Sequence, residues 1–110
     1  MALVRDSVPV MLLREEKYEE FNEHAAENSL NLENADLRMV DLRRANLTKA
    51  NLRGAYLRNA DMRGVDLSDA DLTGASLHDA WISGCLFPMN ISAEEISLSV
   101  TFGTRMRPRP

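Results

Sequence analysis

The sequence predicts a small all-β solenoid with a helical segment at each end. An unbroken five-residue repeat runs through residues 30–89, and the segments on either side of it follow helical patterns instead. The chain has only one Trp, two Tyr and three Phe, so its core should be narrow and built from aliphatic side chains. These observations predict one repeat domain with capping elements, within the size range of a single domain.

The repeat has a large apolar residue at its third position and usually a small apolar residue at its first. A helix advances about 500° in five residues, so these side chains would not form one stripe on a helix. On a flat strand, successive third positions would point to opposite faces. The chain must therefore turn once in every quintet so that all third positions face one axis. These positions are Leu32, Leu37, Leu42, Leu47, Leu52, Leu57, Met62, Leu67, Leu72, Leu77, Ile82 and Phe87.

Quintets such as ADLRM, ANLTK, ANLRG and ADLTG resemble the A(D/N)LXX repeats of the pentapeptide-repeat family. The resemblance covers about half of the chain and implies a right-handed quadrilateral β-helix with four quintets per coil. Residues 30–89 would then form about three coils, in which residues 20 apart stack on one another. Glycines fall at two opposite corners, where we expect type II turns, and the other two corners should be tighter or more irregular. The corner glycines are Gly54 with Gly74, and Gly64 with Gly84.

Residues 1–29 form an N-terminal segment that we expect to contain a capping helix over residues 12–28. Its apolar residues Tyr18, Phe21 and Ala25 are spaced three and four apart among glutamates, which is the spacing of one helix face. Solenoids need such caps because their core is otherwise exposed at the ends. The alternative is that the acidic face of this helix binds a partner.

Residues 90–104 form the second predicted cap. Ser92 and Glu95 make a capping box that opens a helix, and Gly103 supplies its stop. This helix covers the last coil or pairs with its equivalent in a second chain. The following residues, 105–110, read as a basic and disordered tail. The predicted helix within residues 90–104 has an apolar face formed by Ile96, Val100 and Phe102.

The second position of each quintet should point outward and is usually Asp or Asn. Three large aromatic or apolar residues stand out from this pattern, and they are candidate contact residues: Tyr56, Trp81 and Leu86. Trp81 and Leu86 belong to the final coil, so the C-terminal helix could cover them, or a partner protein could bind them.

Arginines at the fourth position should form two columns on the surface. The columns contain Arg38 with Arg58, and Arg43 with Arg63. They could form a basic stripe that binds an anionic partner, with Arg105, Arg107 and Arg109 extending it. Alternatively, the aspartates two residues before them, Asp36, Asp41 and Asp61, neutralise them on the same side of the coil.

The sequence offers no catalytic, cofactor-binding or metal-binding pattern, and we expect no enzyme. The two histidines are far apart and have no ligand at metal spacing. The single cysteine, Cys85, excludes an internal disulfide and suits a reducing compartment, at an inward position that predicts a buried structural thiol. No apolar stretch approaches the roughly 20 residues of a membrane span, so we expect a cytoplasmic protein with no membrane partner.

These features favour a non-catalytic scaffold or protein-interaction module. We expect it to form a homodimer through its C-terminal end and to bind a protein partner that the sequence does not identify. The family resemblance offers an alternative, the mimicry of duplex DNA that protects a topoisomerase, but residues 30–89 carry eight acids against seven bases and are close to neutral. Nucleic-acid binding through the arginine columns is a further alternative that a sequence pI of about 5.1 does not favour.

Overall fold

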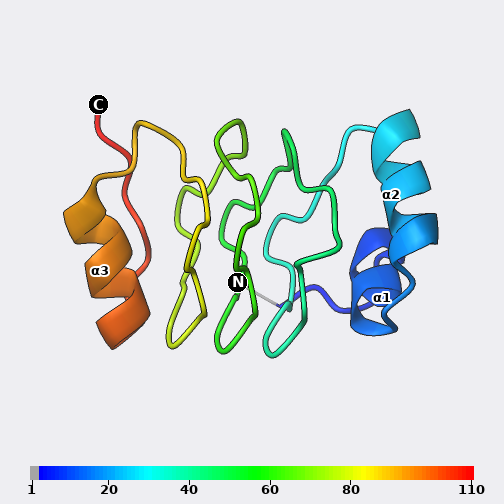
Figure 1. Ribbon diagram of the computed structural model, residues 1–110, viewed down its shortest axis with the longest axis horizontal. Coiled ribbons are helices and arrows are strands. Elements are labelled where there is room, and N and C mark those ends of the chain that lie inside the picture. Colours follow the sequence, from blue (N-terminus) through cyan, green and yellow to red (C-terminus); the bar gives the residue numbers. More distant parts are fainter. Residues whose placement is uncertain (1–2) are drawn as a thin grey trace.

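The computed structural model describes residues 3–110 and places the repeat segment between two groups of helices (Figure 1). Helices α1 (Val8–Arg14) and α2 (Tyr18–Glu27) lie at one end of the molecule, and α3 (Ala93–Phe102) lies at the other. The repeat segment winds between them as a series of stacked loops. The helices are therefore the end caps of a coiled chain.

The repeat segment pairs with itself at intervals of 20 residues. Parallel bridges join Asn31 to Asn51 and Asn51 to Asp71, and the next side of the coil has the bridges Asp36–Tyr56 and Tyr56–Ser76. Four quintets therefore make one coil, as the resemblance implied.

The expected all-β class differs from the structure in one respect. The bridges are isolated, and the only regular elements within residues 3–110 are the three helices. The reason is geometric, since each side of a coil is extended over only a few residues before the next turn begins.

Each quintet ends in a tight turn. The N–H of Ala55 donates to the Leu52 carbonyl at 3.0 Å, and the N–H of Ala60 donates to the Leu57 carbonyl at the same distance. The fifth residue of most quintets has a positive φ, as at Gly54 (68°), which is the conformation that the third residue of a type II turn requires. Arg44 and Asp69 are exceptions, and Arg44 lies at the same corner as Gly64 and Gly84.

Regular turns are not restricted to the glycine corners. Met39, Asn59 and Asp79 occupy one corner in successive coils, with φ values of 64°, 58° and 57°. The prediction that the corners without glycine would be irregular is wrong for this corner. Asn and Asp tolerate the left-handed region better than most residues, which explains two of the three positions.

The core consists of the third-position side chains with the small first-position residues between them. In the first two coils all eight third positions are buried, from Leu32 to Leu67. In the third coil Leu72 and Leu77 are buried, whereas Ile82 and Phe87 are only partly buried. The core is therefore less well covered on two sides of the last coil.

The N-terminal cap contains two helices where the sequence predicted one over residues 12–28. Helix α1 begins at the N-cap Ser7 with a proline in its first turn, and the chain breaks at Glu16, whose φ is 60°. Val10 and Leu13 of α1 and Phe21 of α2 are buried against the first coil. The cap is fixed by polar contacts as well, because the Asn22 side chain donates to the Arg44 carbonyl at 3.1 Å.

Helix α3 has the predicted ends. The Ser92 side chain accepts a hydrogen bond from the Glu95 N–H at 3.2 Å, and Gly103 ends the helix with φ 75°.

The predicted disorder of residues 105–110 is wrong for most of this segment. Met106 is buried, and its N–H donates to the Ala75 carbonyl at 2.9 Å. The N–H of Arg109 donates to the Asn90 carbonyl at 2.7 Å. A single apolar residue among arginines and prolines gives no sequence pattern, yet it anchors the segment to the last coil.

Replacing Leu52 with Ala should lower the free energy of unfolding by about 3 kcal/mol, because it leaves a cavity in the middle coil. The measurement is urea denaturation followed by far-UV circular dichroism. Thr48→Ala, at an exposed turn position, serves as control and should change the free energy of unfolding by no more than about 0.5 kcal/mol. Equal effects of the two substitutions would show that the third positions are not core.

Acid should destabilise the protein through Asp41. Two hydrogen bonds from the Arg43 guanidinium, at 3.0 and 2.9 Å, lower the pKa of this carboxyl from 3.8 to about 2. Since the folded-state pKa is depressed, the contribution is complete above pH 3.8 and is lost as the pH falls toward about 2.

Thermal melts across this range should therefore show a shallower decline of Tm for Asp41→Asn than for the wild type. Identical declines would contradict the assignment. Residual decline in the variant is expected, because Arg38 and Arg63 also lower the pKa values of Asp36 and Asp61.

Candidate functional site: an arginine-lined groove

One side of the coil gathers cations and aromatic residues. We call the outward surface of residues 35–39, 55–59 and 75–79 the second face. Its second positions are Asp36, Tyr56 and Ser76, which the parallel bridges place in one row. Its fourth positions are Arg38, Arg58 and His78, and the backbone hydrogen bonds from Met39 to Arg58 and from Asn59 to His78 place these in a second row.

At the N-terminal edge of the second face, three arginines surround one buried carboxylate. The Asp36 side chain is 1% exposed, and it lies 3.1 Å from Arg5 Nε and 3.6 Å from Arg14 Nη1. Arg38 adds a forked pair through Nε at 2.8 Å and Nη2 at 3.0 Å. The hydrogen bonds from Arg38 are the main cause that lowers the Asp36 pKa, so the carboxylate stays charged and the arginines remain in excess.

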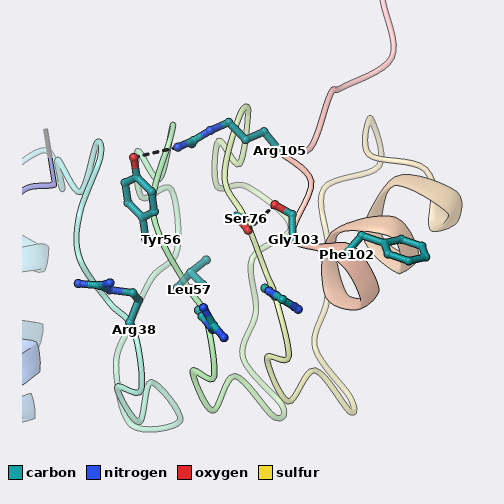
Figure 2. Close-up of a pocket in the computed structure, with 9 residues that line it drawn as sticks. Arg38, Tyr56, Leu57, Ser76, Phe102, Gly103 and Arg105 are labelled. Atoms are coloured by element: carbon teal, nitrogen blue, oxygen red, sulfur yellow. Dashed lines mark hydrogen bonds between the residues drawn. The ribbon is translucent and has the colours of Figure 1, made fainter. Parts of the chain in front are cut away.

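At the C-terminal edge, the segment after α3 crosses the last coil and reaches the middle one. Ser76 Oγ donates to the Gly103 carbonyl at 3.0 Å. The Arg105 side chain extends over the coil, donating to the Gly74 carbonyl and to the Tyr56 hydroxyl at 2.8 Å each (Figure 2). Its guanidinium carbon also lies 4.9 Å from the centre of the Tyr56 ring, within the range of a cation–π contact.

These contacts enclose a shallow groove of about 300 Å³ on the second face. It is bounded by the row of fourth-position side chains on one side and by the segment after α3 on the other (Figure 2). Its main lining side chains are Arg38, Tyr56, Arg58, Ser76, His78 and Arg105.

The neutralisation of the arginine columns by neighbouring aspartates is confirmed for three of the four predicted arginines. Arg38 forms its forked pair with Asp36, and Arg43 and Arg63 form equivalent pairs with Asp41 and Asp61. Arg58 is the exception, because the residue two positions before it is Tyr56. Within residues 3–110 the Arg58 side chain has no hydrogen bond and no ion pair, and it is exposed.

Trp81 lies on the surface and not under the C-terminal helix. Its side chain is 59% exposed, and the guanidinium carbon of Arg63 lies 4.8 Å from the centre of the Trp81 ring. Leu86 is also exposed. The expectation that α3 covers these two residues is therefore wrong for the single chain.

Only part of the predicted apolar face of α3 is buried. Ile96 and Val100 are half-buried against the core, whereas Phe102 is exposed. A second groove of about 290 Å³ lies between this helix and the last coil, with Ile82 and Ile96 among its lining side chains.

The described residues contain no arrangement that resembles a metal or nucleophile site. No group of three or more His, Cys, Asp and Glu side chains within residues 3–110 could hold a metal ion. Burial, followed by the charge of Asp66, raises the pKa of the half-buried Cys85 thiol to about 11. This thiol is protonated at neutral pH and is therefore a poor nucleophile.

The turn in every quintet and the 20-residue register define a repeat protein of stacked coils. The family model for pentapeptide repeats matches the chain in eight copies, over residues 29–64 and 50–87. The chain belongs to the pentapeptide repeat family. No curated protein and no solved structure matches it. Within residues 3–110, no helix has the length and apolar character needed to cross a membrane.

Sequence reasoning placed Arg38 and Arg58 in one column and extended the basic stripe to Arg105, but it did not connect these arginines with Tyr56, and it missed Arg5. Tyr56 and Arg105 are 49 residues apart, and no repeat pattern links them. The signal for Arg105 was the arginine content of residues 105–110, although this segment was also expected to be disordered.

The contact between Tyr56 and Arg105 should be measurable as a coupling energy. Tyr56→Phe should lower the free energy of unfolding by about 1 kcal/mol, because it removes the acceptor of one Arg105 hydrogen bond. The same substitution should have a much smaller effect in an Arg105→Ala background. A double-mutant cycle by urea denaturation measures this difference, and additive effects of the two substitutions would contradict the contact.

Proposed function

We propose that the protein is a non-catalytic protein-interaction module that self-associates through its C-terminal end. The observation that supports this is the incomplete cover of the last coil. Leu42 and Met62 are fully buried, whereas Ile82, which follows them in the same column, is only partly buried. In the neighbouring column Leu47 and Leu67 are likewise buried, whereas Phe87 is only partly buried.

The C-terminal segment covers the other two sides of this coil. Met106 is buried beside Gly74 and Ala75, and the Leu77 N–H donates to Ser99 Oγ at 2.9 Å. The third and fourth sides lack an equivalent cover from residues 3–110. A solenoid end that leaves core positions partly open is suited to packing against another molecule.

Exposed apolar side chains occur beside these partly open core positions. Trp81 and Leu86 precede Ile82 and Phe87, and Met89, which is 92% exposed, follows in the next turn. Large apolar side chains near one another on a surface mark interaction sites, and Trp is enriched among the residues that dominate binding energy. A second copy of the chain, packed at this end, would bury them.

Family membership supports the non-catalytic part of the proposal, since pentapeptide repeat proteins are generally non-catalytic. We also propose that the coils form a right-handed quadrilateral β-helix. The turn in each quintet and the spacing of the parallel bridges support this geometry. DNA mimicry is not favoured, because the second face and its edges carry five arginines: Arg5, Arg14, Arg38, Arg58 and Arg105.

Light scattering after size-exclusion chromatography tests the self-association. The full chain should have twice the monomer mass, and Trp81→Glu combined with Met89→Glu should have the monomer mass, because charges would enter the apolar contact. Met39→Glu is the matched control, because Met39 is 74% exposed but belongs to the first coil. This variant should remain a dimer.

Trp81 provides a second readout, since it is the only tryptophan of the chain. Its emission should shift to shorter wavelength as the protein concentration rises through the dimerisation range. A monomeric wild type at all concentrations, or a dimer that the double variant leaves intact, would contradict the proposal.

A further inference from the structure

We propose that the groove on the second face binds a short acidic peptide segment of a partner protein. The proposal rests on the function proposed above as an interaction module, but it concerns a different surface from the self-association end. It follows from Arg58, the one fourth-position arginine that has no carboxylate partner within residues 3–110.

The repeat has a local rule for its arginines. Five arginines occupy fourth positions, namely Arg38, Arg43, Arg53, Arg58 and Arg63. Three of them pair with the aspartate two residues earlier, and Arg53 pairs with Asp71 in the next coil at 3.0 Å. The residue two positions before Arg58 is Tyr56, and the second-position residue of the next coil is Ser76. The two positions at which the other arginines pair with an aspartate are therefore occupied by neutral residues.

The two carboxylates on the second face, Asp36 and Asp79, do not pair with Arg58. Asp36 lies in the preceding coil, and Arg5, Arg14 and Arg38 surround it. Asp79 lies near His78, with 3.6 Å between Oδ2 and Nε2, and its side chain is largely exposed. The second face itself has two arginines and two aspartates, and its edges add Arg5, Arg14 and Arg105, with Glu16 beside Arg14 and Arg38.

Arg105 brings a second cation without a carboxylate to the same groove. Its hydrogen bonds go to the Gly74 carbonyl and the Tyr56 hydroxyl, both of which are neutral. Figure 2 shows this side chain held over Tyr56 on the C-terminal side of the groove. Arg58 and Arg105 therefore both retain guanidinium donors for an anionic ligand, and Arg105 is held in place before binding.

The chemistry of this groove matches carboxylates on a peptide. A guanidinium presents paired N–H donors that suit a carboxylate, and charge-assisted hydrogen bonds of this kind are the stronger ones. Tyr56 adds an aromatic surface, and Tyr and Arg are enriched where binding energy concentrates. Ser76 and His78 provide polar contacts along the floor.

Charge placement favours a short peptide over a nucleic acid. Residues 3–29, which form the neighbouring cap, carry seven acids against three bases. A long polyanion would extend beyond the arginines at the N-terminal edge and over the acids of the cap, and charges interact within a Debye length of about 8 Å at physiological salt. A short acidic segment can remain within the groove and avoid this repulsion.

Fluorescence anisotropy with a labelled, end-blocked peptide of alternating Glu and Gly tests the proposal at physiological salt. The wild type should bind it and should not bind the equivalent Lys–Gly peptide. Arg58→Gln should weaken binding about tenfold, the size expected for losing one charge-assisted hydrogen bond. Arg43→Gln, at the same quintet position on the neighbouring side, should leave the Kd within about twofold.

Substitutions at Tyr56 separate charge from packing. Tyr56→Asp recreates the Asp–X–Arg pattern of the neighbouring quintets and should pair with Arg58, so peptide binding should fall about tenfold. Tyr56→Phe keeps Arg58 without a carboxylate but removes the hydroxyl that holds Arg105, so it should weaken binding less than Tyr56→Asp does. Circular dichroism and thermal melts confirm that each variant is folded.

Equal binding by wild type, Arg58→Gln and Tyr56→Asp would overturn the proposal, and so would a wild type that fails to bind the acidic peptide. Tighter binding of a single-stranded oligonucleotide than of the peptide would also overturn it, in favour of a nucleic-acid ligand. Light scattering of the same variants keeps the two proposals separate. Arg58→Gln should weaken peptide binding without changing the molar mass, whatever that mass is.

Discussion

The stacking of third-position side chains at 20-residue intervals is the constraint on which the rest of the structure depends. Leu32, Leu52 and Leu72 are buried in one column, with Leu52 between the other two, because the backbone bridges hold them in register. A shift of one quintet would still bury leucines, but it would place different outward residues beside one another. The register therefore decides the surface as well as the core, and the arginine-lined groove exists only in this register.

Three quintets share an electrostatic unit that the quintet of Tyr56 lacks. Where Asp precedes Arg by two positions, the two side chains form a forked ion pair, as in Asp61 and Arg63. Exposed pairs of this kind add little stability, but they remove cations from the set available to a ligand. Tyr56 breaks the unit in the middle coil, and the segment after α3 uses the resulting space by placing Arg105 on the Tyr56 hydroxyl. One substitution within the repeat thus links the C-terminal cap to the groove.

The periodic parts of the fold could be predicted from sequence, and the parts that depend on single contacts could not. The quintet period indicated the turns and the leucine columns, and Ser92 and Gly103 indicated both ends of α3. The break at Glu16 was missed because the helical pattern of the N-terminal segment continues across it. The packing of Met106 was missed for a related reason, since an isolated apolar residue has no period. At the site, the rows of Arg38 and Arg58 followed from the repeat, whereas Arg105 reaches Tyr56 across 49 residues.

The most direct test of the 20-residue register is the measurement of scalar couplings across backbone hydrogen bonds by NMR on labelled protein. The account predicts a coupling between the Leu57 amide nitrogen and the Ser76 carbonyl carbon, and another between the Asn59 nitrogen and the His78 carbonyl carbon, since these bonds are 2.9 Å long. Couplings from the same amides to carbonyls at any other spacing, such as the four-residue spacing of a helix, would contradict the account.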